Sequence, residues 1–125
     1  MTQLKDYAQP LARLFLGALF VIAGLGKLGD VEGFAQYMAS AGVPEALAWP
    51  AILVEILGGL AVMLGIQARL AALVLAGFSV VTALLYHFQP SDPMQQAIFL
   101  KNFAIAGGFL LIFSHGPGRY ALSKA

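Results

Sequence analysis

The chain has 125 residues, of which 60% are hydrophobic even with its 14 Gly left out of the count, and only 10% are charged. Soluble domains average about 45–50% apolar residues with Gly included and about 25% charged ones, and one small core cannot hide such an excess of apolar surface. A formal net charge of +1 and the absence of Cys exclude a nucleic-acid-binding surface, a disulfide scaffold and Cys-ligated metal sites. The outside of this protein is therefore expected to face lipid.

Four transmembrane helices are predicted, at residues 10–28, 47–66, 70–88 and 97–114. Each has about the 20 mostly apolar residues that cross a bilayer, provided that charges near helix ends, such as Arg13 and Lys27, extend to the interface. Between the first two spans, residues 30–41 are amphipathic at helical spacing, with Asp30 as the expected N-cap, and should lie on the membrane surface. The sequence thus predicts a single all-α domain over residues 1–125, a polytopic four-helix transmembrane bundle with one short interfacial helix.

The distribution of Lys and Arg predicts how the bundle is oriented. The two ends and the turn after the second span share one side of the membrane and hold most of the cations: Lys5, Arg13, Arg69, Arg119 and Lys124. Because cytoplasmic segments carry the excess of Lys and Arg, both termini are expected in the cytoplasm. The alternative is a cleaved N-terminal signal peptide. It would leave three spans and put the C-terminus outside, against the same charge bias.

Small residues four positions apart indicate where helices could pack closely. The pairs are Ala61 with Gly65, Ala72 with Ala76, Ser79 with Ala83, and Ala104 with Gly108. For any one pair, the alternative is that Ala and Gly are simply common in this chain. Together the four pairs favour a compact bundle.

Glu55 is the one charge predicted to lie deep inside a span. It is about eight residues, or roughly 12 Å, into its helix, which is too deep for a Glu side chain to reach the interface. A carboxylate at that depth is paired, protonated or functional. Other polar residues fall in the outer half of the bundle: Lys27, Tyr86, His87, Lys101 and Asn102. We expect the bundle to gather these around Glu55 in one cavity that opens to the non-cytoplasmic face, with Lys27 at its rim.

Structural alternatives remain open for these residues. Lys27 could be an interfacial anchor, and His87 could cap the C-terminus of its helix. Glu55 and Lys101 could form an ion pair that only sets the helix register. No metal site is expected, because His87 and His115 lie on opposite faces of the membrane.

Several short motifs occur in a definite order along nearly the whole chain. They comprise residues 13–17 (Arg-Leu-Phe-Leu-Gly), 20–28 (Phe-Val-Ile-Ala-Gly-Leu-Gly-Lys-Leu), 42–44 (Gly-Val-Pro), 55–60 (Glu-Ile-Leu-Gly-Gly-Leu), 64–65 (Leu-Gly), Arg69, 87–88 (His-Phe), 101–108 (Lys-Asn-Phe-Ala-Ile-Ala-Gly-Gly) and 116–118 (Gly-Pro-Gly). In this order and spacing the chain resembles the DoxX family of small bacterial inner-membrane proteins. The resemblance implies four transmembrane helices, no tightly bound prosthetic group, and recurrent family positions at Lys27, Glu55, Lys101 and Asn102. Members of that family include subunits of a thiosulfate:quinone oxidoreductase and of membrane complexes for oxidative-stress or thiol defence.

The residues and the resemblance lead to one hypothesis: an inner-membrane protein acting as an accessory or quinone-facing subunit in redox or oxidative-stress physiology. It would be at most a non-catalytic or quinone-interacting subunit of a membrane oxidoreductase. Lys101 and Asn102 would bind an anionic or carbonyl head group, with Glu55 as proton acceptor or counter-ion and His87 as proton relay. The expected partners are the lipid bilayer and either a second copy or a redox subunit.

Two other functions stay open. One is a small proton-coupled transporter, in which Lys27 and Lys101 would disfavour cationic substrates. The other is a structural membrane protein that binds a partner and no ligand.

Overall fold

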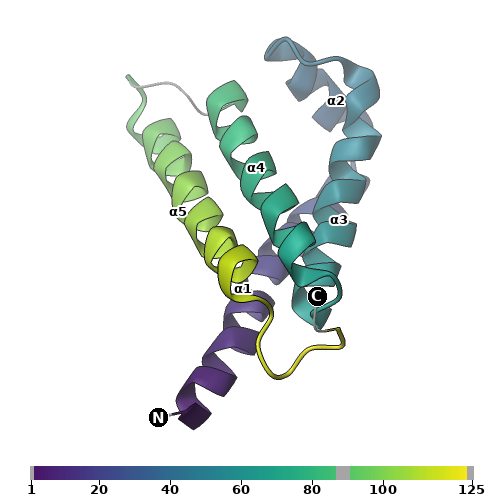
Figure 1. The fold of residues 1–125 in the computed structure, drawn as a ribbon. Coiled ribbons are helices and arrows are strands. Elements are labelled where there is room, and N and C mark those ends of the chain that lie inside the picture. Colours follow the sequence, from purple (N-terminus) through teal and green to yellow (C-terminus); the bar gives the residue numbers. More distant parts are fainter. Residues whose placement is uncertain (1, 87–90, 124–125) are drawn as a thin grey trace.

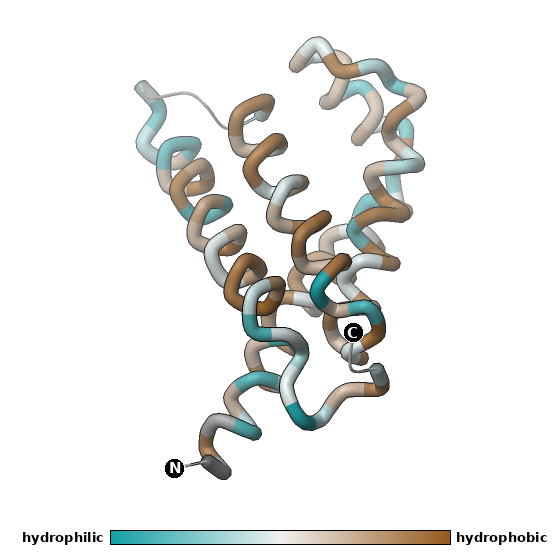
Figure 2. The backbone as a smooth tube through the Cα atoms, in the orientation of Figure 1, coloured by the Kyte–Doolittle hydropathy of each residue, from teal (hydrophilic) through white to brown (hydrophobic). Residues whose placement is uncertain are grey.

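The computed structural model describes residues 2–86 and 91–123, and its regular elements there are helices (Figure 1). In chain order they are α1 (Thr2–Leu28), α2 (Val31–Ser40), the short 3-10 turn η1 (Glu45–Leu47), α3 (Ala48–Leu64), α4 (Ala68–Tyr86) and α5 (Pro93–His115). Four stretches are long and apolar enough to cross a membrane: Asp6–Leu28, Glu45–Leu64, Ala68–Tyr86 and Pro93–His115. Hydrophilic residues concentrate toward the two ends of the bundle (Figure 2). The prediction of an all-α polytopic membrane protein is confirmed.

The helix boundaries differ from the predicted spans at the two longest helices. α1 begins at Thr2 and continues through Pro10, where the predicted span started. α5 begins at Pro93, four residues before the predicted start, because Asp92 accepts hydrogen bonds from the backbone N–H of Met94 and Gln95 at 3.0 and 3.4 Å. An Asp N-cap followed by Pro is a strong helix-start signal. The polar composition of this segment obscured it in the hydropathy pattern.

The predicted interfacial helix corresponds to α2. Asp30 caps it as expected, accepting from the backbone N–H of Gly33 at 2.9 Å. Met38 of α2 is only 2% exposed. The apolar face of α2 therefore packs against one end of the bundle, which we call the outer end, and the half of the bundle nearest to α2 is called the outer half.

The four long helices form a ring in the order α1, α3, α4, α5. α1 packs closely along α3 and α4 along α5, α3 joins α4, and the seam between α5 and α1 is the loosest. Glycines allow α1 and α3 to approach at backbone distance: a Cβ built on Gly17 would lie 2.5 Å from the carbonyl oxygen of Gly59. Two turns further along α1, a Cβ on Gly24 would lie 3.3 Å from the Cβ of Glu55. Close contact through Gly is a usual way for transmembrane helices to associate.

The predicted small-residue pairs are buried on α4, whereas the pair on α5 is only half correct. On α4 the buried side chains are Ala68, Ala71, Ala72, Leu75, Ala76, Ser79 and Ala83, which include both predicted pairs. On α5, Ala104 is exposed, and the buried residues are Ala106, Phe109 and Ile112. Gly108 does pack closely on α1, since a Cβ there would lie 3.1 Å from Cδ1 of Leu16.

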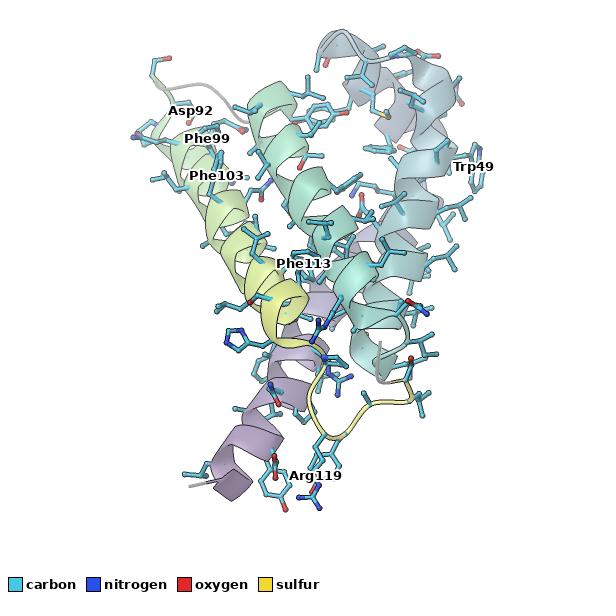
Figure 3. The ribbon with its side chains drawn as sticks, viewed as in Figure 1. Trp49, Asp92, Phe99, Phe103, Phe113 and Arg119 are labelled. Atoms are coloured by element: carbon cyan, nitrogen blue, oxygen red, sulfur yellow. The ribbon has the colours of Figure 1, made fainter. Side chains whose placement is uncertain are left out.

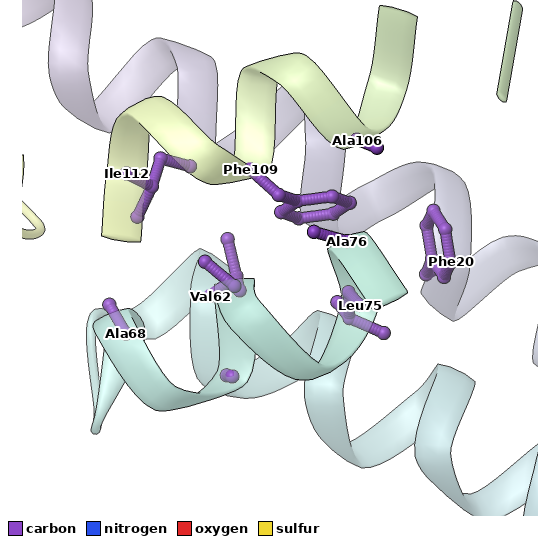
Figure 4. Close-up of a cluster of buried hydrophobic side chains, with 10 residues drawn as sticks. Phe20, Val62, Ala68, Leu75, Ala76, Ala106, Phe109 and Ile112 are labelled. Atoms are coloured by element: carbon purple, nitrogen blue, oxygen red, sulfur yellow. The ribbon is translucent and has the colours of Figure 1, made fainter. Parts of the chain in front are cut away.

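Aromatic rings divide the inner half of the bundle from the outer half. Phe109 of α5 is fully buried beside Ala76 of α4 (Figure 4). The ring of Phe20 on α1 meets it edge to face at a centroid distance of 5.4 Å and meets Phe78 of α4 at 6.2 Å. Such edge-to-face pairs favour a fixed arrangement of the rings.

The outward faces are apolar, as expected for contact with lipid. Phe15 is 69% exposed and Leu57 is 61% exposed. Trp49, near the start of α3, points away from the bundle (Figure 3). Exposed apolar surface of this extent suits a hydrocarbon environment.

Arg13 does not extend to the interface as predicted but points into the bundle, where it is 2% exposed. Its Nη1 donates to the carbonyl oxygens of Val62 and Met63 at 3.3 and 3.1 Å, in the last turn of α3. Its Nη2 donates to the carbonyl oxygen of Tyr120 in the C-terminal segment. The guanidinium therefore adds charged donors to carbonyl groups at the end of α3, where intrahelical partners become few, although the Val62 carbonyl oxygen also accepts from the Gly65 N–H at 3.3 Å.

The C-terminal segment also pairs directly with the end of α3. Leu122 and Ser123 donate backbone hydrogen bonds to the carbonyl oxygens of Leu64 and Gly65 at 3.1 and 2.9 Å. Gly65 has a φ of 73°, the left-handed conformation that commonly ends a helix. Arg13 and these backbone bonds together hold the C-terminal segment against the bundle.

Replacing Arg13 with Gln should lower the free energy of unfolding by about 2 kcal/mol or more, because hydrogen bonds to a charged group contribute about 1.5–3 kcal/mol. Arg119→Gln is the matched control, since it removes an exposed ion pair to Asp6 and a contact of the guanidinium with the Tyr120 ring at 6.0 Å, and it should cost less than about 1 kcal/mol. SDS-induced unfolding in mixed micelles measures both, and limited carboxypeptidase digestion reports release of the C-terminal segment. Equal stability of the two variants would contradict the role of Arg13 in holding the C-terminal segment against the bundle.

Candidate functional site

A pocket of about 440 Å³ lies between the outer halves of the helices, above the aromatic contacts of Phe20. All five helices contribute to it, and most of its wall is apolar. Its polar and ionisable side chains, apart from Tyr37 on α2, are Lys27, Glu55, Ser79, Thr82, Tyr86, Lys101 and Asn102. Apolar walls with a few placed polar groups are typical of a small-molecule site.

Glu55 is paired with Lys27. The Lys27 Nζ lies 2.9 Å from Oε1 and 3.0 Å from Oε2 of Glu55, so one ammonium bridges both carboxylate oxygens. The Glu55 side chain is 4% exposed and that of Lys27 is 30% exposed. The alternative of a Glu55–Lys101 pair is therefore wrong. Lys27 is also not merely an interfacial anchor, because it pairs with Glu55.

The glycine contact between α1 and α3 explains why Lys27 is the partner. Gly24 packs on α3 at Glu55, and Lys27 lies three residues later on the same face of α1. A large side chain at Gly24 would hold the helices apart and place the ammonium beyond reach. The ion pair therefore depends on a glycine that carries no polar group itself.

Asn102 joins α5 to α4. Its Nδ2 donates to the carbonyl oxygen of Ser79 and to Oγ1 of Thr82, both at 3.2 Å. The Thr82 hydroxyl donates in turn to the Ser79 carbonyl oxygen at 3.1 Å. Because an amide nitrogen has two hydrogens, both donors of Asn102 are used, and the side chain can offer a ligand only its carbonyl oxygen.

Helix α2 covers the pocket from its outer end. The Lys27 Nζ lies 5.2 Å from the centroid of the Phe34 ring, within range of a cation–π interaction. The ring of Tyr37 packs on that of Tyr86 at 5.2 Å between centroids, which ties α2 to α4. These contacts place α2 over the end of the pocket at which the sequence predicts an opening.

The most exposed part of the pocket wall includes the seam between α1 and α5. The exposed side chains among the lining residues are Leu19 of α1, Tyr37 of α2 and Lys101 of α5. α1 and α5 pack loosely against each other, so an opening between Leu19 and Lys101, called the side opening below, would be accessible from the apolar region of the bilayer. The opening to the non-cytoplasmic face stays a prediction, because residues 87–90 lie outside the described residues.

The structure thus brings Lys27, Glu55, Tyr86, Lys101 and Asn102 to one pocket. His87, the expected proton relay, lies outside the described residues. Within residues 2–86 and 91–123, no three His, Cys, Asp or Glu side chains gather where they could hold a metal ion. The remaining chemistry is that of an ion pair, a second Lys and an amide oxygen.

Two features had no clear sequence signal, one in the pocket and one at the other end of the bundle. Phe34 and Tyr37 were expected on a surface helix, and only tertiary packing turns them toward the pocket. Arg13, a second buried charge at the other end of the bundle, was assigned to the interface because it lies near the end of an apolar run. The deep carboxylate itself was identifiable from hydropathy alone.

The chain matches one family profile and two proteins that are named inner membrane proteins. The DoxX family profile matches residues 8–88. Inner membrane protein YqjF of Escherichia coli (strain K12) is 40% identical over 124 residues, covering 99% of this chain and 95% of that protein. Inner membrane protein YphA of the same organism is 32% identical over 122 residues, covering 91% of this chain and 86% of that protein.

A more limited similarity extends to a protein from another bacterium. The protein named "Putative oxidoreductase CatD" of Bacillus subtilis (strain 168) is 32% identical over 66 residues, covering 53% of this chain and 49% of that protein. No solved structure matches this chain significantly.

Proposed function

Because the chain belongs to the DoxX family of membrane proteins, we propose that it is a membrane subunit that binds a lipid-soluble molecule with a polar head group, with a quinone as the first candidate. The observation that carries the proposal is the buried Lys27–Glu55 pair in the wall of an apolar pocket. We place the protein in the bacterial inner membrane, as its relatives are named, with both termini cytoplasmic by the distribution of Lys and Arg. Among the relatives described above, the name of CatD supports a redox role.

The chemistry of the pocket residues suits a quinone head group. Lys27 has three N–H donors, and two are shared with the Glu55 oxygens, which leaves one for a ligand carbonyl. The Asn102 carbonyl oxygen can accept from a ligand hydroxyl. Glu55 acts as the counter-ion that keeps the Lys27 ammonium charged in an apolar setting. An apolar tail would leave through the side opening into lipid.

The ion pair also bears on the transporter alternative. A carboxylate that binds protons and cations in turn has to be free of a fixed cation, whereas Glu55 is bridged by Lys27. Two Lys residues at the pocket oppose a positively charged substrate. We therefore favour ligand binding by an accessory subunit over proton-coupled export.

Decylubiquinone binding to the protein in nanodiscs, measured by calorimetry against empty nanodiscs, tests the proposal. We expect saturable binding that weakens about tenfold or more in Glu55→Gln, because Lys27 without its counter-ion would extend toward the interface and the ligand carbonyl would lose its charged donor, a bond of about 1.5–3 kcal/mol. Ser114→Ala is the control, since Ser114 is exposed at the other end of α5 and donates only to the Leu111 carbonyl oxygen and contacts His115. A folded wild-type protein that binds no quinone would refute the assignment and leave a structural ion pair as its explanation.

A further inference from the structure

Lys101 lies well inside its span and has no counter-ion among the described residues. Since α5 begins at Pro93, Lys101 is eight residues, or about 12 Å, along the helix, a depth similar to that of Glu55 on α3. It is exposed and lines the pocket. The ion pairs in the described part of the chain join Lys27 to Glu55 and Arg119 to Asp6, and neither includes Lys101.

The described wall of the pocket therefore carries an excess positive charge. Lys27 and Lys101 contribute two cations and Glu55 one anion. Glu55 is already bridged through both carboxylate oxygens, so it cannot neutralise Lys101 without losing Lys27. An uncompensated ammonium at this depth is costly in an apolar environment, and an anionic partner would offset that cost.

The neighbouring polar groups do not supply that partner. The Thr82 hydroxyl and the Asn102 amide are engaged with each other and with the Ser79 carbonyl oxygen. No other Asp or Glu side chain is among the described lining residues. A bound anion would supply the counter-charge that the described lining residues do not.

We infer that this pocket selects amphiphiles that carry one negative charge on the head group, and that Lys101 determines this selectivity. The inference rests on the proposed function, because it assigns the charge of the ligand in the same pocket. A volume of about 440 Å³ is toward the small end of the range for drug-sized ligands. It suits an acidic ring or one carboxylate head with an apolar tail that projects between α1 and α5.

Two matched pairs of ligands test the inference. The hydroxynaphthoquinone lawsone is an anion at neutral pH, and its methyl ether has the same ring without the charge. Dodecanoate and dodecanol make the same comparison on an alkyl chain that is not a quinone. Calorimetry with the protein in zwitterionic phosphatidylcholine nanodiscs, corrected for partition into empty nanodiscs, gives the affinity for each.

We expect lawsone to bind about tenfold or more tightly than its methyl ether, the size of effect of one charged hydrogen bond. Lys101→Gln should abolish this preference and Lys101→Arg should retain it. Arg119→Gln, at the opposite end of the bundle, should leave it unchanged. The unfolding transition of each variant shows whether it is folded.

The outcomes separate the inference from the proposed function. Equal affinity for lawsone and its ether, unaffected by Lys101→Gln, would overturn the inference while quinone binding stands. Binding of dodecanoate, but of neither quinone nor dodecanol, would support anion selection and overturn the quinone assignment. Failure of the folded protein to bind decylubiquinone or any of the four would overturn both.

Discussion

Replacing Lys27 with Met should destabilise the protein more than replacing Glu55 with Gln, although both substitutions remove the same ion pair. Lys27→Met leaves the Glu55 carboxylate, whose side chain is 4% exposed, without a cation. Removing one partner of a buried pair costs about 3–5 kcal/mol. Glu55→Gln instead leaves Lys27, which is 30% exposed at the end of α1 and can extend toward the interface. We expect that variant to lose only about 1 kcal/mol.

The double variant provides the control for this asymmetry. Lys27→Met with Glu55→Gln leaves no buried charge, so it should be more stable than Lys27→Met alone. The free energies come from SDS-induced unfolding in mixed micelles, followed by the fluorescence of Trp49, the single Trp of the chain. Additive losses would show that the two side chains do not interact energetically. Equal losses in the single variants would contradict the difference in their burial.

Substituting Ala at Gly17 should cost about 1–3 kcal/mol, the usual range for overpacking a tight contact. The new Cβ would lie 2.5 Å from both the Gly59 carbonyl oxygen and the Met63 Cγ, so α1 would have to move away from α3. That movement would also separate Lys27 from Glu55. Decylubiquinone affinity should therefore fall together with stability.

Gly77→Ala is the matched control, because a Cβ on Gly77 meets nothing within 4 Å. Ala is favoured over Gly inside a helix by about 1 kcal/mol, so this variant should be neutral or slightly more stable. The same unfolding titration measures both variants. If Gly17→Ala were as stable as Gly77→Ala, the close approach of α1 and α3 would not hold in the membrane.

Hydropathy predicted the elements well because a lipid-facing helix shows its length directly in sequence. The starts of α1 and α5 were misplaced because polar residues there obscured the helix, although Asp92 and Pro93 carry a recognisable start signal. The predicted α2 was correct, since its N-cap and amphipathic spacing are local features. Local sequence signals were thus sufficient to predict features that depend on one helix alone.

Contacts between helices were less predictable. Small residues four apart identified the buried face of α4, yet they missed Gly17 and Gly59, which meet from different helices. The deep carboxylate was found from burial cost, but its partner was sought on α5 and lies on α1. Arg13 and Lys27 both lie near the ends of one apolar run, and sequence alone could not tell that both turn inward.

By itself, the sequence determined that this chain spans the membrane four times and that Glu55 requires an explanation, because both follow from the cost of placing a residue in lipid. Only the tertiary structure decided that Lys27 neutralises Glu55, that α2 covers one end of the pocket and that no described residue compensates the charge of Lys101. The physical reason is that burial cost depends on one helix at a time. Pairing depends on which faces of two helices meet, and in this protein glycines on α1 and α3 determine which faces of these two helices are in contact.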